Sequence, residues 1–131
     1  MEKVSAHGDN ELYKVVINSP SGNQVIADEP EDKGGKDLGF RPQELLASAL
    51  AACKSITVKM YAERKGWELE AIDVDTEIIR SETEPKTDFV TTISLKGNLT
   101  DEQRQRLLKV AEACPVHKIL TNPIAIQTSL V

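Results

Sequence analysis

The sequence predicts an α+β fold in which the elements follow in the order ββ-α-ββ-α-β. Two observations lead to this prediction. Apolar and polar residues alternate with the period of a β-strand in segments on both sides of the middle of the chain. Between those segments, residues 42–65 form an unbroken helical stretch whose first half is almost entirely apolar.

The N-terminal part contains a predicted β-hairpin. Residues 11–18 place Tyr13, Val15 and Ile17 on one face at period two, residues 19–23 (SPSGN) have the composition of a turn, and residues 24–28 form the second strand. The next segment, residues 29–40, holds four acidic residues and three glycines and has no apolar period. We expect this segment to be an exposed loop.

The central helix is predicted to begin at Pro42 and to end before Gly66, because proline is favoured in a first helical turn and glycine after a last one. Residues 45–53 (LLASALAAC) are apolar nearly all round, which predicts a long buried central helix. Its second half is expected to be wet on the side that carries Lys54, Lys59, Glu63, Arg64 and Lys65. The apolar stripe through Cys53 is expected to continue through Ile56, Met60 and Tyr61.

A second strand pair follows the central helix. Residues 72–78 and 89–95 both alternate apolar and polar side chains, and the polar residues 81–88 join them. The two segments therefore predict a second hairpin.

A second helix is predicted over residues 101–113. Thr100 is a favourable N-cap, and Gln103 stands three positions later as its capping-box partner. Pro115 interrupts this helix. We expect a short apolar turn at residues 116–120 and a last strand formed by the alternating residues 124–130.

Composition bounds the classes of function. With 131 residues, the chain has room for one domain, and residues 1–131 are expected to form it. A formal charge of −5 provides no basic field for nucleic acid or for an anionic membrane. The polar N-terminus has no apolar signal region, and no uninterrupted apolar stretch approaches eighteen residues, so we expect a cytoplasmic protein without nucleic-acid or membrane partners.

Two cysteines carry most of the functional information. In a reducing compartment, such a pair indicates reactive thiol chemistry more than a structural disulfide. Cys53 lies on the apolar stripe of the central helix and could equally be a small buried apolar residue. Cys114 ends a helix against Pro115 with His117 nearby, and these local features alone would make Cys114 the more reactive thiol. His117 could be a helix-end cation or a base.

A metal site is not expected. Structural zinc sites use four ligands, and the chain has four cysteine and histidine residues, namely Cys53, Cys114, His7 and His117. Only Cys114 and His117 are close in sequence. His7 lies in an N-terminal tail that we expect to fray. No cofactor-binding motif is present in the sequence.

Two segments resemble the paired signatures of the OsmC-like family, which includes organic hydroperoxide resistance enzymes. They are residues 41–53 (RPQELLASALAAC) and residues 113–118 (ACPVHK), and their cysteines lie 61 positions apart (114 − 53). The resemblance implies that Cys53 attacks a peroxide and becomes a sulfenic acid, which Cys114 converts to a disulfide. It also implies an intertwined homodimer in which the thiol sites form between subunits, and an external thiol reductant.

The sequence departs from the family pattern at two positions. Family peroxidases have a glutamate ten residues before the reactive cysteine, where this chain has Gln43, with the carboxylate displaced to Glu44. They also have an arginine in the N-terminal strands, where this chain offers Lys14 as the cation. Lysine is a poor substitute for a bidentate arginine. Arg41 is a candidate replacement, although twelve helical residues would place it about 18 Å from Cys53.

Two functions follow from these residues. The first is a thiol-dependent reduction of organic hydroperoxides, with Cys53, Cys114 and Glu44 in the site and with Gln43, Arg41, Lys14 and His117 in support. The second is a protein of the same fold that binds a small apolar or sulfur-containing ligand at the dimer interface without turning over peroxide. The missing arginine is the feature that separates them.

Overall fold

The computed structural model describes residues 2–131, and it confirms the α+β class. Its chain divides into two compact units, residues 1–46 and 47–131. The elements are β1 (Ser5–Gly8), β2 (Val15–Asn18), β3 (Gln24–Ala27), the short 3-10 helix η1 (Glu31–Lys33), α1 (Pro42–Lys65), β4 (Glu68–Arg80), β5 (Thr87–Asn98), α2 (Asp101–Glu112) and α3 (Pro115–Thr121).

The first unit contains a three-stranded antiparallel sheet in the order β1-β2-β3. β2 and β3 are the predicted hairpin, with Asn18 opposite Gln24 and a turn in which the Ser19 N–H donates to the Asn23 carbonyl oxygen at 2.8 Å. The expectation that the N-terminal tail frays was wrong, because residues 5–8 pair with β2. Their sequence, SAHG, has no strand period, so this strand exists through the hydrogen bonds that the edge of β2 offers.

The loop after β3 is ordered around one carboxylate. Asp28 is 3% exposed, and its oxygens accept from the backbone N–H groups of Glu29 at 2.7 Å and Leu38 at 3.1 Å. Burial opposes the ionised form, but these hydrogen bonds outweigh it and hold the pKa of the Asp28 carboxyl below 3.8. The loop therefore closes upon an ionised side chain.

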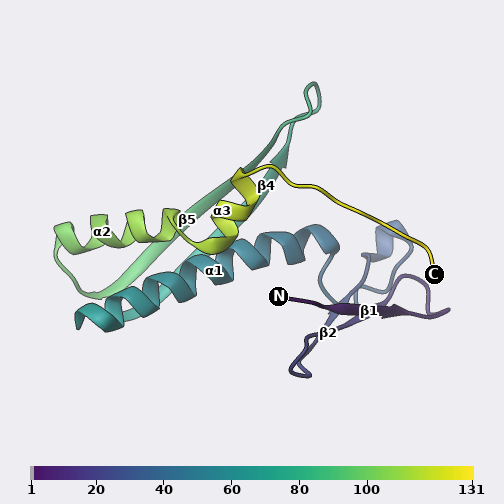
Figure 1. Ribbon diagram of the computed structural model, residues 1–131, viewed down its shortest axis with the longest axis horizontal. Helices are drawn as coiled ribbons and strands as arrows, with labels where there is room; N and C mark the ends of the chain where they lie inside the picture. The colour runs from purple at the N-terminus through teal and green to yellow at the C-terminus, as the bar shows by residue number, and fades with distance from the viewer. Residues whose placement is uncertain (1) are drawn as a thin grey trace. The chain divides into compact units, whose positions relative to one another are not determined.

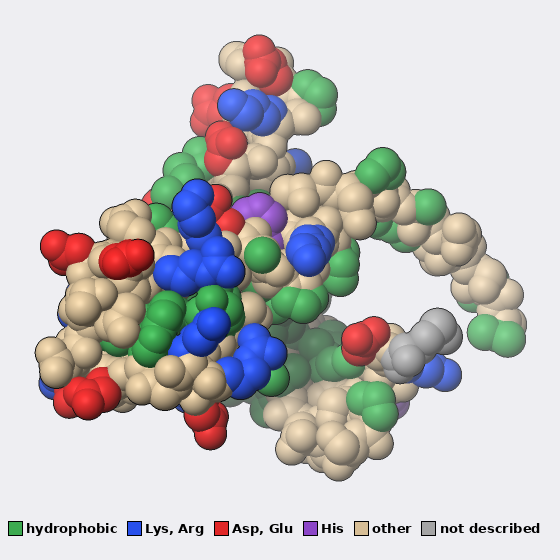
Figure 2. Space-filling model, turned by 60° about the vertical axis from the view of Figure 1, so that its left-hand side comes forward, with side chains coloured by type: hydrophobic (Ala, Val, Ile, Leu, Met, Phe, Trp, Pro, Cys, Tyr) green, Lys and Arg blue, Asp and Glu red, His purple; other side chains and the backbone are tan. Residues whose placement is uncertain are grey.

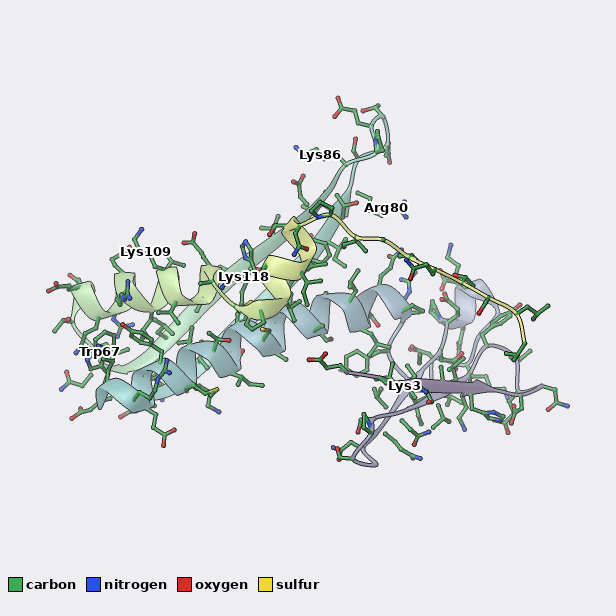
Figure 3. The ribbon with its side chains drawn as sticks, in the orientation of Figure 1. Lys3, Trp67, Arg80, Lys86, Lys109 and Lys118 are labelled. Carbon is green, nitrogen blue, oxygen red and sulfur yellow. The ribbon has the colours of Figure 1, made fainter. Side chains whose placement is uncertain are left out.

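In the second unit, α1 and α2 lie along a long two-stranded ribbon formed by β4 and β5 (Figure 1). The core consists of Val58 and Ala62 from α1 and of Leu107 and Ala111 from α2. Apolar side chains of the ribbon and its flanks pack against this core, namely Trp67, Leu69, Ile72, Ile93, Leu95 and Leu99. Figure 3 labels Trp67, which lies between the end of α1 and the start of the ribbon.

The ribbon contains one irregularity. Leu69 pairs with Gly97 and Ala71 pairs with Lys96, so Glu70 is an extra residue on β4. Because of this bulge, Leu69 and Ile72 both point toward the core although they are three residues apart. Gly97 has φ of 149°, and a Cβ there would collide with the carbonyl oxygen of Glu68, so the bulge requires glycine.

The long helix is buried on one side only within this chain. Its buried residues are Leu50, Lys54, Val58 and Ala62, which follow one another at four-residue spacing. Ile56 and Met60, which were expected to continue the apolar stripe through Cys53, are 56% and 58% exposed in this chain. A ribbon two strands wide covers one face of a helix and leaves the other uncovered.

Lys54 is the main correction on this helix. It was expected to face solvent, yet it is 5% exposed and belongs to the buried stripe. Lys54 is buried because it lies one helical turn from both Leu50 and Val58 on the same face of α1. Its long side chain extends beyond these apolar residues to the carbonyl oxygen of Ala111.

By length and composition alone, α1 could cross a membrane, with a mean hydropathy of 1.2 over its best eighteen-residue window. The core helix of a soluble protein meets the same criterion. The criterion therefore does not separate the two cases.

The second helix begins as predicted, and the segment after it differs. The Thr100 hydroxyl accepts from the Gln103 N–H at 3.1 Å, and the Gln103 side chain accepts from the Thr100 N–H at 2.9 Å, which completes the capping box. Residues 115–121 form α3, where a turn was expected. Pro115 fits the first position of a helix, so it starts α3 as well as ending α2.

The predicted last strand is absent from the described residues. Residues 123–131 have no regular structure, and Ile126 and Leu130 are 85% and 99% exposed. Figure 2 shows this segment projecting as a single chain with apolar side chains on its surface. The alternation is that of a strand, but a strand forms only where a neighbouring strand supplies hydrogen bonds, and within residues 2–131 none pairs with it.

Leu107→Ala should lower the free energy of unfolding by about 2–5 kcal/mol, because the side chain is fully buried and its loss leaves a cavity. Urea denaturation followed by circular dichroism measures the change. Leu108→Ala is the matched control, since Leu108 is 44% exposed and should cost about 0.5 kcal/mol or less. Equal losses in the two variants would contradict the assignment of the core.

Candidate dithiol site

The fold brings the two cysteines to the start of α3. Cys53 lies in α1, Cys114 lies between α2 and α3, and both are free thiols. The Val116 N–H donates to Cys53 Sγ at 3.4 Å, and the His117 N–H donates to Cys114 Sγ at 3.4 Å. Two neighbouring backbone N–H groups therefore hold the two sulfurs, one each.

The break between α2 and α3 creates this arrangement. A residue before proline is driven into the extended region, and Cys114 accordingly has φ of −70° and ψ of 151°. In that conformation Cys114 is the N-cap of α3, and its sulfur accepts the N–H three residues ahead. The remaining N–H group of the first turn of α3, that of Val116, donates to Cys53 of α1.

The two thiols differ in access. Cys53 is partly exposed, whereas Cys114 is fully buried. Burial raises the pKa of the Cys114 thiol, and a hydrogen bond with Cys53 raises it further. The N–H of His117 and the charge of Lys54 act in the opposite direction without cancelling the effect of burial. Cys53 is thus the more exposed of the two cysteines, and burial favours the protonated form of Cys114.

Lys54 is a residue of the site that the sequence reasoning missed. Its Nζ donates to the Ala111 carbonyl oxygen at 2.8 Å and lies 2.9 Å from His117 Nδ1. The four-residue spacing from Leu50 to Val58 was a signal that could have placed it on the buried face. His117, which was predicted as a supporting residue, contacts both neighbours: its ring contacts Lys54, and its backbone N–H donates to Cys114 Sγ.

The other predicted residues belong to the first unit. Arg41 and Gln43 are exposed, and the Arg41 N–H donates to the Glu44 carboxylate at 2.8 Å at the start of α1. Lys14 forms an ion pair with Glu11 at 3.5 Å. The roles of these four residues in the chemistry stay predictions.

A cavity of about 540 Å³ adjoins the site in the second unit. Lys54 and His117 contribute to its wall, together with apolar side chains that include Leu50, Phe89 and Leu120. Such a cavity suits a small, largely apolar molecule. Within residues 2–131, no group of three or more His, Cys, Asp or Glu side chains could hold a metal ion.

The fold and the thiol pair define an α+β protein with a dithiol site, and comparison with known proteins identifies its family. The model of the OsmC-like protein family matches residues 34–129, which is more than half of the chain. The chain therefore belongs to the OsmC-like family. No curated protein matches the sequence.

Several solved structures share the fold. The OsmC-like protein of Mycoplasma pneumoniae is similar with a TM-score of 0.77 and 19% identity, over 92% of this chain and 86% of that one. The organic hydroperoxide resistance protein OhrB of Bacillus subtilis has a TM-score of 0.62 and 24% identity, over 92% and 90%. An organic hydroperoxide resistance protein OsmC of Legionella pneumophila has a TM-score of 0.66 and 19% identity, over 92% and 89%.

Iodoacetamide at neutral pH should alkylate Cys53 well before Cys114 in the folded protein, because Cys53 alone is accessible. The labelling rate of Cys114 should rise with pH over a range that lies higher than for an ordinary thiol, since burial raises its pKa. Mass spectrometry of the labelled peptides gives both rates, and the urea-unfolded chain, in which the rates should converge, is the control. Faster labelling of Cys114 in the folded state would contradict this order.

Proposed function

We propose that this protein reduces organic hydroperoxides, with Cys53 as the attacking thiol and Cys114 as the resolving thiol. One observation carries the proposal: an accessible sulfur and a fully buried sulfur accept hydrogen bonds from adjacent N–H groups of one helical turn. The names of the Bacillus subtilis and Legionella pneumophila proteins, which share the fold, support the same class of substrate.

The first step takes place at Cys53. Its thiolate attacks one oxygen of the O–O bond, that bond breaks, and the alkoxide takes up a proton and leaves as an alcohol. Cys53 becomes a sulfenic acid, oxidised by two electrons. The N–H of Val116 stabilises the negative charge on sulfur before the attack.

The second step joins the two sulfurs. The Cys114 sulfur attacks the Cys53 sulfur, the S–O bond breaks, and the oxygen leaves as water with the proton that Cys114 gives up. An external thiol reductant then returns two electrons to the disulfide. Because Cys114 is buried behind Cys53, the sulfenic acid meets a thiol before it meets a second peroxide.

Ligand binding without turnover is the second candidate, and the cavity of about 540 Å³ favours it. A small apolar ligand would occupy that cavity against Leu50 and Phe89, and the thiols would contribute no chemistry. Reactivity of Cys53 toward hydroperoxide separates the two candidates.

Cys53→Ser should abolish the fast loss of thiol that cumene hydroperoxide causes, because it removes the attacking sulfur. Cys114→Ser should keep that fast phase and then accumulate sulfinic acid on Cys53, since no resolving thiol traps the sulfenic acid. Stopped-flow thiol titration and mass spectrometry measure both effects. If Cys53→Ser keeps the fast phase and Cys114→Ser loses it, the roles are reversed. If the wild-type thiols react no faster than free cysteine, the ligand-binding function replaces this one.

We also propose that the protein works as a homodimer. α1 exposes the large apolar side chains Leu46, Ile56 and Met60, and the C-terminal segment exposes Ile126 and Leu130. Contact with a second copy would bury this apolar surface, and each Å² removed from water would stabilise the dimer by about 25 cal/mol.

Sedimentation at micromolar concentration should give about twice the chain mass of 14.4 kDa. Ile56→Lys should shift the protein toward the monomer, because it buries a charge in the proposed interface, while Lys59→Gln on the same helix serves as the control. A stable monomer of the wild-type chain at that concentration would rule out the dimer.

A further inference from the structure

Lys54 joins the two helices that flank Cys114. Its Nζ donates to the carbonyl oxygen of Ala111 near the end of α2, and the same carbonyl accepts from the Cys114 N–H at 3.4 Å. Its other partner is the ring of His117 in α3, whose backbone N–H donates to Cys114 Sγ. Ala111 accepts from the backbone N–H of Cys114, and His117 donates to its sulfur. The Lys54 side chain of α1 therefore contacts both residues that hold Cys114.

This lysine is buried without an ion-pair partner. It is 5% exposed, and among residues 2–131 no carboxylate lies within 4.0 Å of its Nζ. Asp88 of β5 and Glu112 of α2 line the adjoining cavity, but both are exposed to solvent and neither pairs with Lys54. A buried charge that lacks a counter-ion costs stability, so its presence beside a titratable sulfur indicates a role in the chemistry of that sulfur.

The resolving step needs a positive charge near the Cys114 sulfur. Cys114 must lose its proton to attack the sulfenic acid, and its burial opposes the thiolate. Within the second unit, the groups that act on Cys114 are Cys53 and Lys54 of α1 and His117 of α3. Glu112 of α2 and Asp88 of β5 are the acidic residues in the wall of the adjoining cavity. Of these groups, Lys54 is the buried one that carries positive charge and contacts the residues around the sulfur.

We propose that Lys54 is the positioning residue of the resolving step: it fixes the junction of α2 and α3 around Cys114, and its ammonium is the counter-charge of the Cys114 thiolate that attacks Cys53. This inference rests on the proposed function. As the S–S bond forms and the S–O bond breaks, the proton released by Cys114 leaves with the oxygen as water. No oxidant or reductant beyond the sulfenic acid is required.

The role is specific to the second step. Cys53 Sγ accepts its hydrogen bond from Val116, and none of the contacts of Lys54 described above involves Val116 or Cys53. Loss of the charge should therefore leave the attack on peroxide nearly unchanged and slow the formation of the disulfide. The two rates can be measured separately because the sulfenic acid lies between them.

The test is a single turnover of the reduced full-length protein with one equivalent of cumene hydroperoxide. Dimedone traps the sulfenic acid on Cys53, and mass spectrometry follows the Cys53–Cys114 disulfide with time. Lys54→Gln keeps hydrogen-bond donors and removes the charge, and Lys54→Arg keeps the charge. Lys59→Gln on α1 and Lys118→Gln on α3 are the controls, since both lysines are exposed (Lys118 is labelled in Figure 3).

We expect Lys54→Gln to form the sulfenic acid at nearly the wild-type rate and the disulfide at least about tenfold more slowly, as for a loss of one pKa unit of thiolate stabilisation. The pH at which disulfide formation is half-maximal should rise by about one unit, which a loss of packing alone would not cause. Lys54→Arg should restore part of the rate, and both controls should behave as the wild type.

Disulfide formation in Lys54→Gln at the wild-type rate and with the wild-type pH profile would overturn the inference and leave the proposed function intact. A folded Lys54→Arg that is as slow as Lys54→Gln would also overturn it, since the charge would then have no effect. If the wild-type protein forms no sulfenic acid, the proposed function itself fails. The urea midpoints of unfolding show which variants are folded. If Lys54→Gln is not folded, the rates of Lys54→Arg are compared with those of the wild type instead.

Discussion

Pro115 cannot continue α2, because it has no N–H to donate and its ring drives the preceding residue out of the helical region. The geometry of the thiol pair depends on this constraint. The break turns Cys114 into the N-cap of a new helix and leaves two N–H groups of the first turn directed at sulfur atoms. Without the break, Cys114 would be one more residue on the face of α2, and Cys53 would have no donor from α3.

The site combines two sulfurs with opposite requirements. In the proposed reaction, the attacking thiol has to be reached by its substrate and the resolving thiol has to be kept from it. The partial exposure of Cys53 and the full burial of Cys114 are compatible with these two roles. The cost appears at Lys54, where a charge lies in the apolar layer of α1 between Leu50 and Val58. A local rule of core composition is broken next to the chemistry, which is where such exceptions are expected.

The sequence was sufficient for elements whose signals are local. The capping box at Thr100 and the proline and glycine that bound α1 depend on neighbours within a few residues, and they were predicted correctly. Elements that depend on distant partners were not. β1 exists through pairing with β2, the alternating C-terminal residues pair with no strand in the described part of the chain, and both were misjudged from their own composition.

The same distinction applies to the site. The two cysteines were singled out from their number and positions, their expected roles came from the resemblance to two family signatures, and the break at Pro115 could be read directly from the sequence. Lys54 was missed because its charge was taken to indicate solvent, whereas its position relative to Leu50 and Val58 decides its burial. The polar groups that a buried lysine contacts are a property of the tertiary structure, and the composition of one helix does not reveal them.

The bulge at Glu70 also restricts the alignments of the ribbon that are possible. A regular two-stranded ribbon could slide by two residues and still present apolar side chains to the helices. The extra residue fits only opposite Gly97, because another residue there would meet the carbonyl of Glu68. A slipped pairing would therefore place a side chain where none fits. The glycine and the bulge together therefore fix the register in which β4 pairs with β5.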